Sequence, residues 1–120
     1  MVAVGVFVYQ KYLSPILKNN STQRTKIVLN KDSSVLLFKK KNQGKVYSLE
    51  IEIEGNSSEI IHLEIGESEK RILHDARIKN GNIDFVYSND WYIDSCYLRI
   101  EPSRKSNSKL NISYRFLSLD

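Results

Sequence analysis

Apolar and polar residues alternate with a period of two along much of this chain. In the stretch 46–54, Leu49, Ile51 and Ile53 alternate with serine and glutamate, and the same alternation recurs in the stretches 59–65, 95–101 and 110–116. Successive side chains of a β-strand point to opposite faces of its sheet, so this period places the apolar residues on one face and the polar residues on the other. The pattern predicts antiparallel strands with one buried face and one solvated face.

Turn-forming residues divide the chain into eight such segments. Clusters of Asn, Gly, Ser and Asp, such as those at 30–33, 42–44 and 79–82, separate the apolar stretches. No helix of three or more turns is predicted between Lys18 and Asp120. The predicted strands are Thr25–Leu29, Val35–Lys39, Val46–Glu54, Glu59–Ile65, Arg71–His74, Ile83–Tyr87, Ser95–Glu101 and Leu110–Phe116.

The apolar faces of eight strands must be buried against one another. Two antiparallel sheets packed face to face achieve this, so we predict an all-β fold: an antiparallel β-sandwich, jelly-roll or immunoglobulin-like, with a short apolar N-terminal segment. Composition agrees, because alanine, the best helix former, occurs only at Ala3 and Ala76. The strand order stays open. Cys96 is the only cysteine. This excludes only the disulfide-bonded subclass of immunoglobulin folds, not the immunoglobulin-like sandwich in general.

The N-terminal segment differs from the rest of the chain. Val2–Tyr9 is apolar, uncharged and without alternation, yet it is too short to span a bilayer, which needs roughly 20 apolar residues. It fits the distal part of a transmembrane helix, a short interfacial anchor, or a buried first strand. We expect residues 1–17 to form an apolar anchor or partial transmembrane helix, residues 18–24 a polar linker, and residues 25–120 the β-sandwich.

Catalytic and metal-binding motifs are not recognisable in the sequence. His62 lies on the polar face of a predicted strand and His74 at a strand end, without the local ligand spacing of zinc sites. No Gly-x-Ser-x-Gly motif accompanies the many serines, and a lone cysteine on an apolar strand face is usually a small buried side chain. We therefore predict no catalytic residue, no metal site and no cofactor, and expect that the protein is not an enzyme.

One short connection gathers aromatic and acidic residues. Trp91 and Tyr92, with Asp90, Asp94 and Tyr87, lie at or beside the junction of two predicted strands. Aromatic rings ringed by carboxylates are typical of sites for sugars and other small ligands, so these five residues are the candidate ligand-binding site. The alternative is that Trp91 closes one end of the sandwich and buries its ring there.

Positive charge is concentrated in two turns. The net charge is +4, and the lysines at 39–41 with Lys45 flank one turn, while Arg104, Lys105 and Lys109 flank another. If both turns lie at one end, they form a basic rim able to meet phospholipid headgroups or an acidic partner. Otherwise they are solubilising edges. Elsewhere lysines and arginines are interspersed with glutamates, which makes nucleic acid an unlikely partner.

Together these features predict a non-enzymatic β-sandwich of the cell envelope. We expect it to be membrane-anchored through residues 1–17, with its folded domain extracytoplasmic, and to act through protein–protein contact with a partner that the sequence does not identify. The alternative function is a carbohydrate- or small-ligand-binding module that uses the Trp91/Tyr92 loop.

Overall fold

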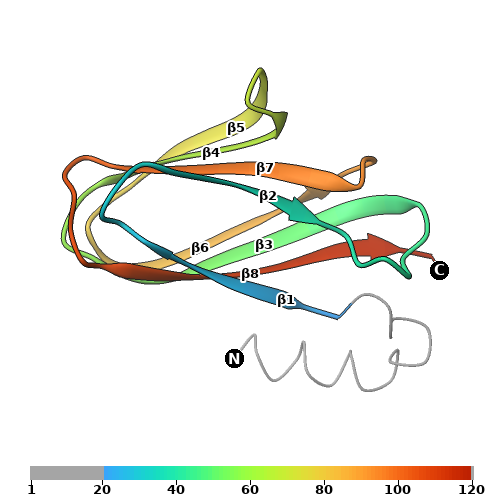
Figure 1. The fold of residues 1–120 in the computed structure, drawn as a ribbon, viewed down its shortest axis with the longest axis horizontal. Coiled ribbons are helices and arrows are strands. Elements are labelled where there is room, and N and C mark those ends of the chain that lie inside the picture. The colour runs from blue at the N-terminus through green and yellow to red at the C-terminus, as the bar shows by residue number, and fades with distance from the viewer. Residues whose placement is uncertain (1–20, 120) are drawn as a thin grey trace.

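The computed structural model describes residues 21–119, so the predicted anchor at 1–17 lies outside the described residues. Eight strands are present, and each overlaps one predicted segment (Figure 1). The first strand begins at Gln23, two residues before its predicted start and inside the predicted linker. Their bounds are β1 Gln23–Val28, β2 Ser33–Phe38, β3 Val46–Ser57, β4 Ile61–Ser68, β5 Arg71–Ile78, β6 Gly81–Asp90, β7 Ser95–Pro102 and β8 Lys109–Ser118.

The strands form two antiparallel sheets of four, with the orders β1-β8-β3-β6 and β2-β7-β4-β5. Consecutive strands alternate between the two sheets, except for β4 and β5, which form a hairpin within one sheet. This strand order is that of a jelly roll. The predicted all-β sandwich is therefore confirmed, and of the two predicted arrangements the structure has the jelly roll.

The core lies between the two sheets and consists of the alternating apolar residues. Central strands supply most of it: Leu49, Ile51 and Ile53 from β3 are each no more than 1% exposed. Cys96 is fully buried in β7, as predicted. Burial raises the pKa of its thiol to about 12, because the thiolate would lose its hydration. At neutral pH this thiol is protonated and is not a nucleophile.

One end of the sandwich is held together by a set of hydrogen bonds, and we call it the proximal end because residues 1–20 join the domain there (Figure 1). It comprises the start of β1, the β2–β3 connection at 39–45, the β6–β7 connection at 91–94 and the end of β8. Gln23 at the start of β1 donates to the carbonyl of Phe38 at 3.0 Å. The amide of Lys39 donates to the carbonyl of Asp94 at 2.9 Å. The opposite end is the distal end.

Gln43 connects the proximal loops to the sheet. Its side chain is only 5% exposed and donates to the carbonyl of Phe116, while its carbonyl oxygen accepts from the amide of Lys40 at 2.9 Å. The sequence marks residues 42–44 as a turn, which is correct, but it does not reveal that the glutamine side chain is buried inside it.

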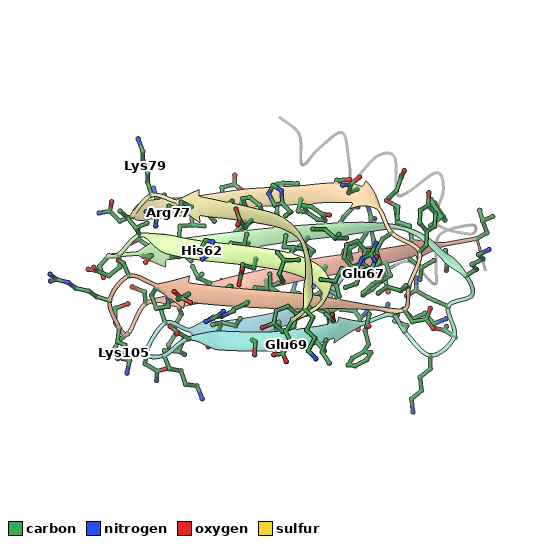
Figure 2. All side chains as sticks on the ribbon, turned by 90° about the horizontal axis from the view of Figure 1, so that it is seen from above. His62, Glu67, Glu69, Arg77, Lys79 and Lys105 are labelled. Atoms are coloured by element: carbon green, nitrogen blue, oxygen red, sulfur yellow. The ribbon has the colours of Figure 1, made fainter. Side chains whose placement is uncertain are left out.

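The two basic turns do not form a common rim. The β2–β3 connection, with the lysines at 39–41 and Lys45, lies at the proximal end, whereas Arg104 and Lys105 lie in the β7–β8 connection at the distal end (Figure 2). The cause is topological. The start of β7 pairs with the end of β2, and β7 then runs the whole length of the sandwich before Arg104 is reached. The condition for a common basic rim, that both turns lie at one end, is therefore not met.

Residues 21–119 contain strands, turns and bends but no helix, and hence no helix that could cross a membrane.

Candidate functional site

The outer face of the β2-β7-β4-β5 sheet is hollowed by an unusual hairpin. The β4–β5 hairpin leaves the plane of its sheet and leans across β7 towards β2 (Figures 1 and 2). Its register is irregular, since Ile65 is opposite His74 whereas Gly66 is opposite Ile72. Such bulges bend a strand pair sharply and increase its twist. The bend raises the tip of the hairpin above the face of the sheet.

Gly66 permits this bend. A Cβ atom at this position would lie 2.3 Å from the carbonyl oxygen of Arg71 and 2.8 Å from the Cα of Ile72, so no larger residue fits without moving the backbone. Gly66 is also the cross-strand neighbour of Tyr97 on β7. The absence of a side chain at Gly66 lets the backbone of Arg71 and Ile72 lie directly against β4.

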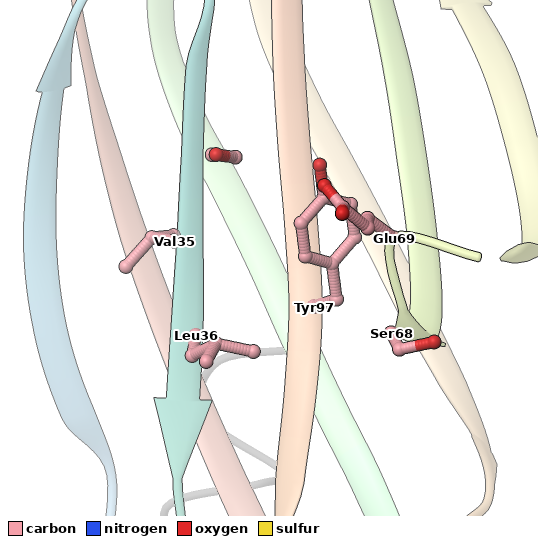
Figure 3. Close-up of a pocket in the computed structure, with 6 residues that line it drawn as sticks. Val35, Leu36, Ser68, Glu69 and Tyr97 are labelled. Atoms are coloured by element: carbon pink, nitrogen blue, oxygen red, sulfur yellow. The ribbon is translucent and has the colours of Figure 1, made fainter. Parts of the chain in front are cut away.

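A groove of about 450 Å³ lies between the hairpin tip and β2 (Figure 3). Leu36 and Tyr97, which are direct cross-strand partners, form its floor. Ser68 and Glu69 form the wall on the hairpin side, and Ser34 and Val35 line it on β2. The volume falls in the range of roughly 300–1,000 Å³ that is usual for ligand sites. We call this hollow the hairpin groove.

Two exposed apolar side chains of β2 lie in or beside the hairpin groove. Leu36 is 50% exposed, and Phe38, two residues further along β2 and on the same face, is 56% exposed. Large apolar side chains that lie together on the solvated face of a sheet are a feature of interaction sites, because folding alone gives no reason to leave them in water.

Glu69 is the carboxylate of the groove that has no ionic partner. Among residues 21–119, the hairpin ion pair joins Glu67 and Arg71 at 3.3 Å, and no ion pair includes Glu69. In Figure 3 its carboxylate is drawn over the Tyr97 ring. The groove thus offers an apolar floor and an acceptor at its lip, a combination that can hold an apolar group beside a hydrogen-bond donor.

Toward the distal end, the same face carries a network of charges. Guanidinium nitrogens of Arg99 lie 2.8 Å from a carboxylate oxygen of Glu101, 3.5 Å from one of Glu64 and 4.0 Å from one of Asp32. The Nε2 atom of His62 lies 3.9 Å from a carboxylate oxygen of Asp75, which is the cross-strand partner of Glu64 on β5. The face is therefore divided along its strands into an apolar part with the groove and a charged part, as in interfaces that join an apolar core to a polar rim.

The charged network brings potential metal ligands together. His62, Glu64 and Asp75 offer donor atoms within 4.8 Å of one another, a grouping that the sequence conceals because Asp75 belongs to another strand. However, Glu64 is bonded to Arg99, and His62 has Arg77 as its cross-strand partner. With two guanidinium groups beside it, this trio is better explained as part of the ion-pair network than as a cation site.

The predicted aromatic site is not assembled as a platform. Trp91 is 3% exposed and Tyr87 7% exposed, so both rings belong to the core. The indole Nε1 of Trp91 donates to the carbonyl of Ser95 at 2.9 Å, which satisfies its only polar atom inside the fold. Tyr92 is 66% exposed, and Asp90 and Asp94 are exposed too. The structure thus separates the five predicted residues into two core aromatics and three surface residues of the proximal end.

The ring of His74 packs against two aromatic rings of β6. It lies 6.1 Å from that of Phe85 and 5.4 Å from that of Tyr87, centroid to centroid, across the edge between the two sheets. Because β5 and β6 are both edge strands on the same side of the sandwich, His74 helps to close this edge.

The other sheet presents a mainly polar outer face. Glu52, Glu54 and Asp84 lie close together there, with Glu54 and Asp84 directly opposite each other on β3 and β6. The pKa of Glu52 is raised to about 6, chiefly because its protonated form donates a hydrogen bond to Glu54, and further by burial and by the charges of Glu54 and Asp84. Repulsion among these carboxylates is a cost that the folded state carries at neutral pH.

Replacing Glu52 by glutamine is expected to stabilise the domain at neutral pH. The folded state binds the Glu52 proton more tightly than the unfolded state, so stability is full below pH 4.5, the ordinary pKa, and falls as the pH rises through about 6. The side chain is partly solvated, so we expect a gain of less than about 1 kcal/mol at pH 7.5 and none at pH 4. Urea unfolding at both pH values measures this. An equal gain at both would show that repulsion is not the cause.

The residues of the hairpin groove were not predicted as a site. Leu36 and Tyr97 stand in predicted strands, and Glu69 in a turn, so each has an ordinary place in its own segment. The available signal was that Leu36 and Phe38 occupy the positions of β2 that the alternation assigns to solvent, where apolar residues are unexpected.

Comparison with known proteins finds similarity of fold alone. No protein family matches the sequence, and no curated protein is significantly similar to it. Similar solved structures include the pre-peptidase C-terminal domain of collagenase from Bacillus anthracis, which is 10% identical with a TM-score of 0.47 and covers 79% of this chain and 88% of that one. PliG, a periplasmic inhibitor of g-type lysozyme from Aeromonas hydrophila, is 10% identical with a TM-score of 0.48 and covers 82% and 87%. The EclA C-terminal domain, a sugar-binding protein, is 14% identical with a TM-score of 0.43 and covers 77% and 74%. These neighbours are β domains.

Proposed function

We propose that this protein is a non-enzymatic binding domain of the cell envelope, tethered by residues 1–17, that holds a segment of a partner protein in the hairpin groove. The observation that supports the binding role is the groove itself: about 450 Å³ of open space over Leu36 and Tyr97, walled by a hairpin that bends only because residue 66 is glycine. The apolar character of Val2–Tyr9 supports the tether.

A protein segment suits this surface better than a sugar. The apolar residues exposed in and beside the groove, Leu36 and Phe38, are an aliphatic side chain and a phenyl ring. Such residues form the centre of protein interfaces, where they bury apolar side chains of the partner. Sugars need many hydrogen-bonding groups around each ring, whereas the groove offers one carboxylate, two serine hydroxyls and the Tyr97 hydroxyl. Glu69 then favours a partner whose apolar residue is followed by a donor such as lysine, arginine or a backbone amide.

Peptides selected on the intact protein are expected to depend on the groove. A random phage-displayed peptide library is panned on the full chain, and the affinities of the selected peptides are measured for Leu36→Ser and Tyr97→Ala. We expect at least a tenfold loss for each, since truncation of a central anchor costs about 2 kcal/mol or more of binding free energy. Leu36 is half exposed, so its replacement leaves the core intact. Thermal melting verifies the folding of both variants.

Val86→Ser is the matched control. Val86 is 62% exposed on the outer face of the other sheet, so this change removes a similar apolar side chain far from the groove. Peptides that lose affinity equally for the control and for the groove variants would contradict the proposal. A glycan array run beside the library detects the alternative: sugars that bind the wild type but not Tyr97→Ala would establish carbohydrate as the ligand in place of a protein.

A further inference from the structure

We infer that the proximal end of the sandwich docks on a membrane surface that contains anionic phospholipids, with Lys40, Lys41 and Lys45 at the headgroups. The inference rests on the proposed tether but not on the hairpin groove. It concerns the folded domain itself, which would contact the lipid surface beside the point where residues 1–20 join it.

The basic loop is held in place by the fold. Lys39 does not face solvent freely, because its ammonium group lies 3.1 Å from the carbonyl of Gly44 and 3.3 Å from a carboxylate oxygen of Asp94. The amide of Gln43 donates to the carbonyl of Lys40 at 3.0 Å, and the Gln43 side chain is buried against β8. Lys41 and Lys45 are exposed. Three ammonium groups on an ordered loop lose little conformational freedom of the backbone on binding.

Exposed aromatic rings accompany the lysines. Tyr92 is 66% exposed and Tyr47 39% exposed, and the carbonyl of Tyr47 accepts the amide of Trp91 at 3.2 Å, which places both tyrosines at the proximal end. Leu119, 81% exposed, follows the last strand at the same end. Tyrosine is enriched at the headgroup level of membranes, where its ring and hydroxyl are both accommodated, and lysine is attracted by the negative surface potential.

Positive charge alone does not determine which end of the sandwich docks on the membrane, as the distal end shows. It carries Lys31, Lys79, Arg104 and Lys105, so it is at least as basic as the proximal end (Figure 2). Among residues 21–119, however, it exposes Ile60 as a large apolar side chain and no tyrosine. Residues 1–20 also join the domain at the other end. Only the proximal end combines positive charge, exposed rings and the covalent connection to the apolar segment.

Docking in this way would set the orientation of the domain. The strands run from the proximal to the distal end, so they would be roughly perpendicular to the membrane plane (Figure 1). The outer face with the hairpin groove would then be perpendicular to the lipid surface and open to the side. A partner on the same membrane or beside it then has access to the groove.

Vesicle sedimentation with the full chain tests the inference. Vesicles of phosphatidylcholine alone are compared with vesicles that also contain phosphatidylglycerol, at low and at high ionic strength. Each lysine near an anionic surface contributes about fivefold to partitioning, so Lys40→Ser/Lys41→Ser/Lys45→Ser is expected to bind anionic vesicles roughly 100-fold less at low salt. Lys79→Ser/Arg104→Ser/Lys105→Ser, with the same loss of charge at the distal end, is expected to bind like the wild type.

The outcomes distinguish failure of the docking surface from failure of the tether. Equal losses in the two triple variants would overturn the inference in favour of a general charge effect. Equal wild-type binding to both kinds of vesicle, unchanged in either variant, would overturn it while leaving the tether intact. Failure of the wild type to bind any vesicle would overturn both the inference and the tether. A loss confined to the proximal variant, with an unchanged melting temperature, supports the inference, and Tyr92→Ser should then add a further loss.

Discussion

Replacing Phe116 by alanine is expected to lower the free energy of unfolding by about 4 kcal/mol. Phe116 is 1% exposed on β8, a central strand of its sheet, and its ring meets that of Tyr114 edge to face at a centroid distance of 6.3 Å. Truncation leaves a cavity that neighbouring strands, held on both sides, cannot close. Since small domains are stable by only about 5–15 kcal/mol, this single change removes much of the total.

Urea unfolding followed by the fluorescence of Trp91 measures the effect. Trp91 is the only tryptophan and is buried in the native state, so its emission reports global unfolding. Phe116→Leu keeps most of the volume and is expected to cost less than about 1.5 kcal/mol, and Leu119→Ala, at an 81% exposed position, close to nothing. If Phe116→Ala cost no more than Leu119→Ala, the packing of β8 described above would be wrong.

Replacing Gly66 by alanine is expected to destabilise the domain by about 3 kcal/mol and to abolish binding in the hairpin groove. The added Cβ atom would come within 2.3 Å of the carbonyl oxygen of Arg71, which is backbone and cannot rotate away. Relief requires that β5 separate from β4 at the bulge. The hairpin tip with Ser68 and Glu69 would then lose its position above Tyr97.

Gly81→Ala is the control for this experiment. Gly81 has a φ of +111°, but a Cβ atom there would meet nothing within 4 Å. Its replacement should cost only the strain of the left-handed backbone, about 1–2 kcal/mol, and should leave peptide binding in the groove unchanged. Unfolding by urea and the affinity of a groove-dependent peptide are measured for both variants. Full peptide affinity in Gly66→Ala would show that the bend does not depend on the absence of a side chain.

Much of the fold follows from the sequence because strand side chains alternate. Apolar stretches bounded by turn residues identify all eight strands. The period of two assigns residues such as Leu49, Ile51 and Cys96 to the buried face, since apolar groups on one side of a strand leave water only by facing another sheet. The same reasoning allows for a buried Trp91 as the alternative to a binding platform, and burial with a hydrogen bond to Ser95 is what the structure has. The candidate ligand-binding site predicted from sequence, in contrast, was centred on the largest aromatic ring, and a large ring is as valuable to a core as to a site.

The hairpin groove and the proximal end depend on which strands become neighbours. Alternation determines the face that a residue occupies, but it carries no information about strand order or cross-strand partners. Only the jelly-roll order places Leu36 beside Tyr97, and only the bulge at Gly66 brings Glu69 over them. By itself, then, the sequence determined the strands and the core. The tertiary structure decided the pairing, the bend of the hairpin and the separation of the two basic turns, because these arise from contacts between residues far apart in the chain.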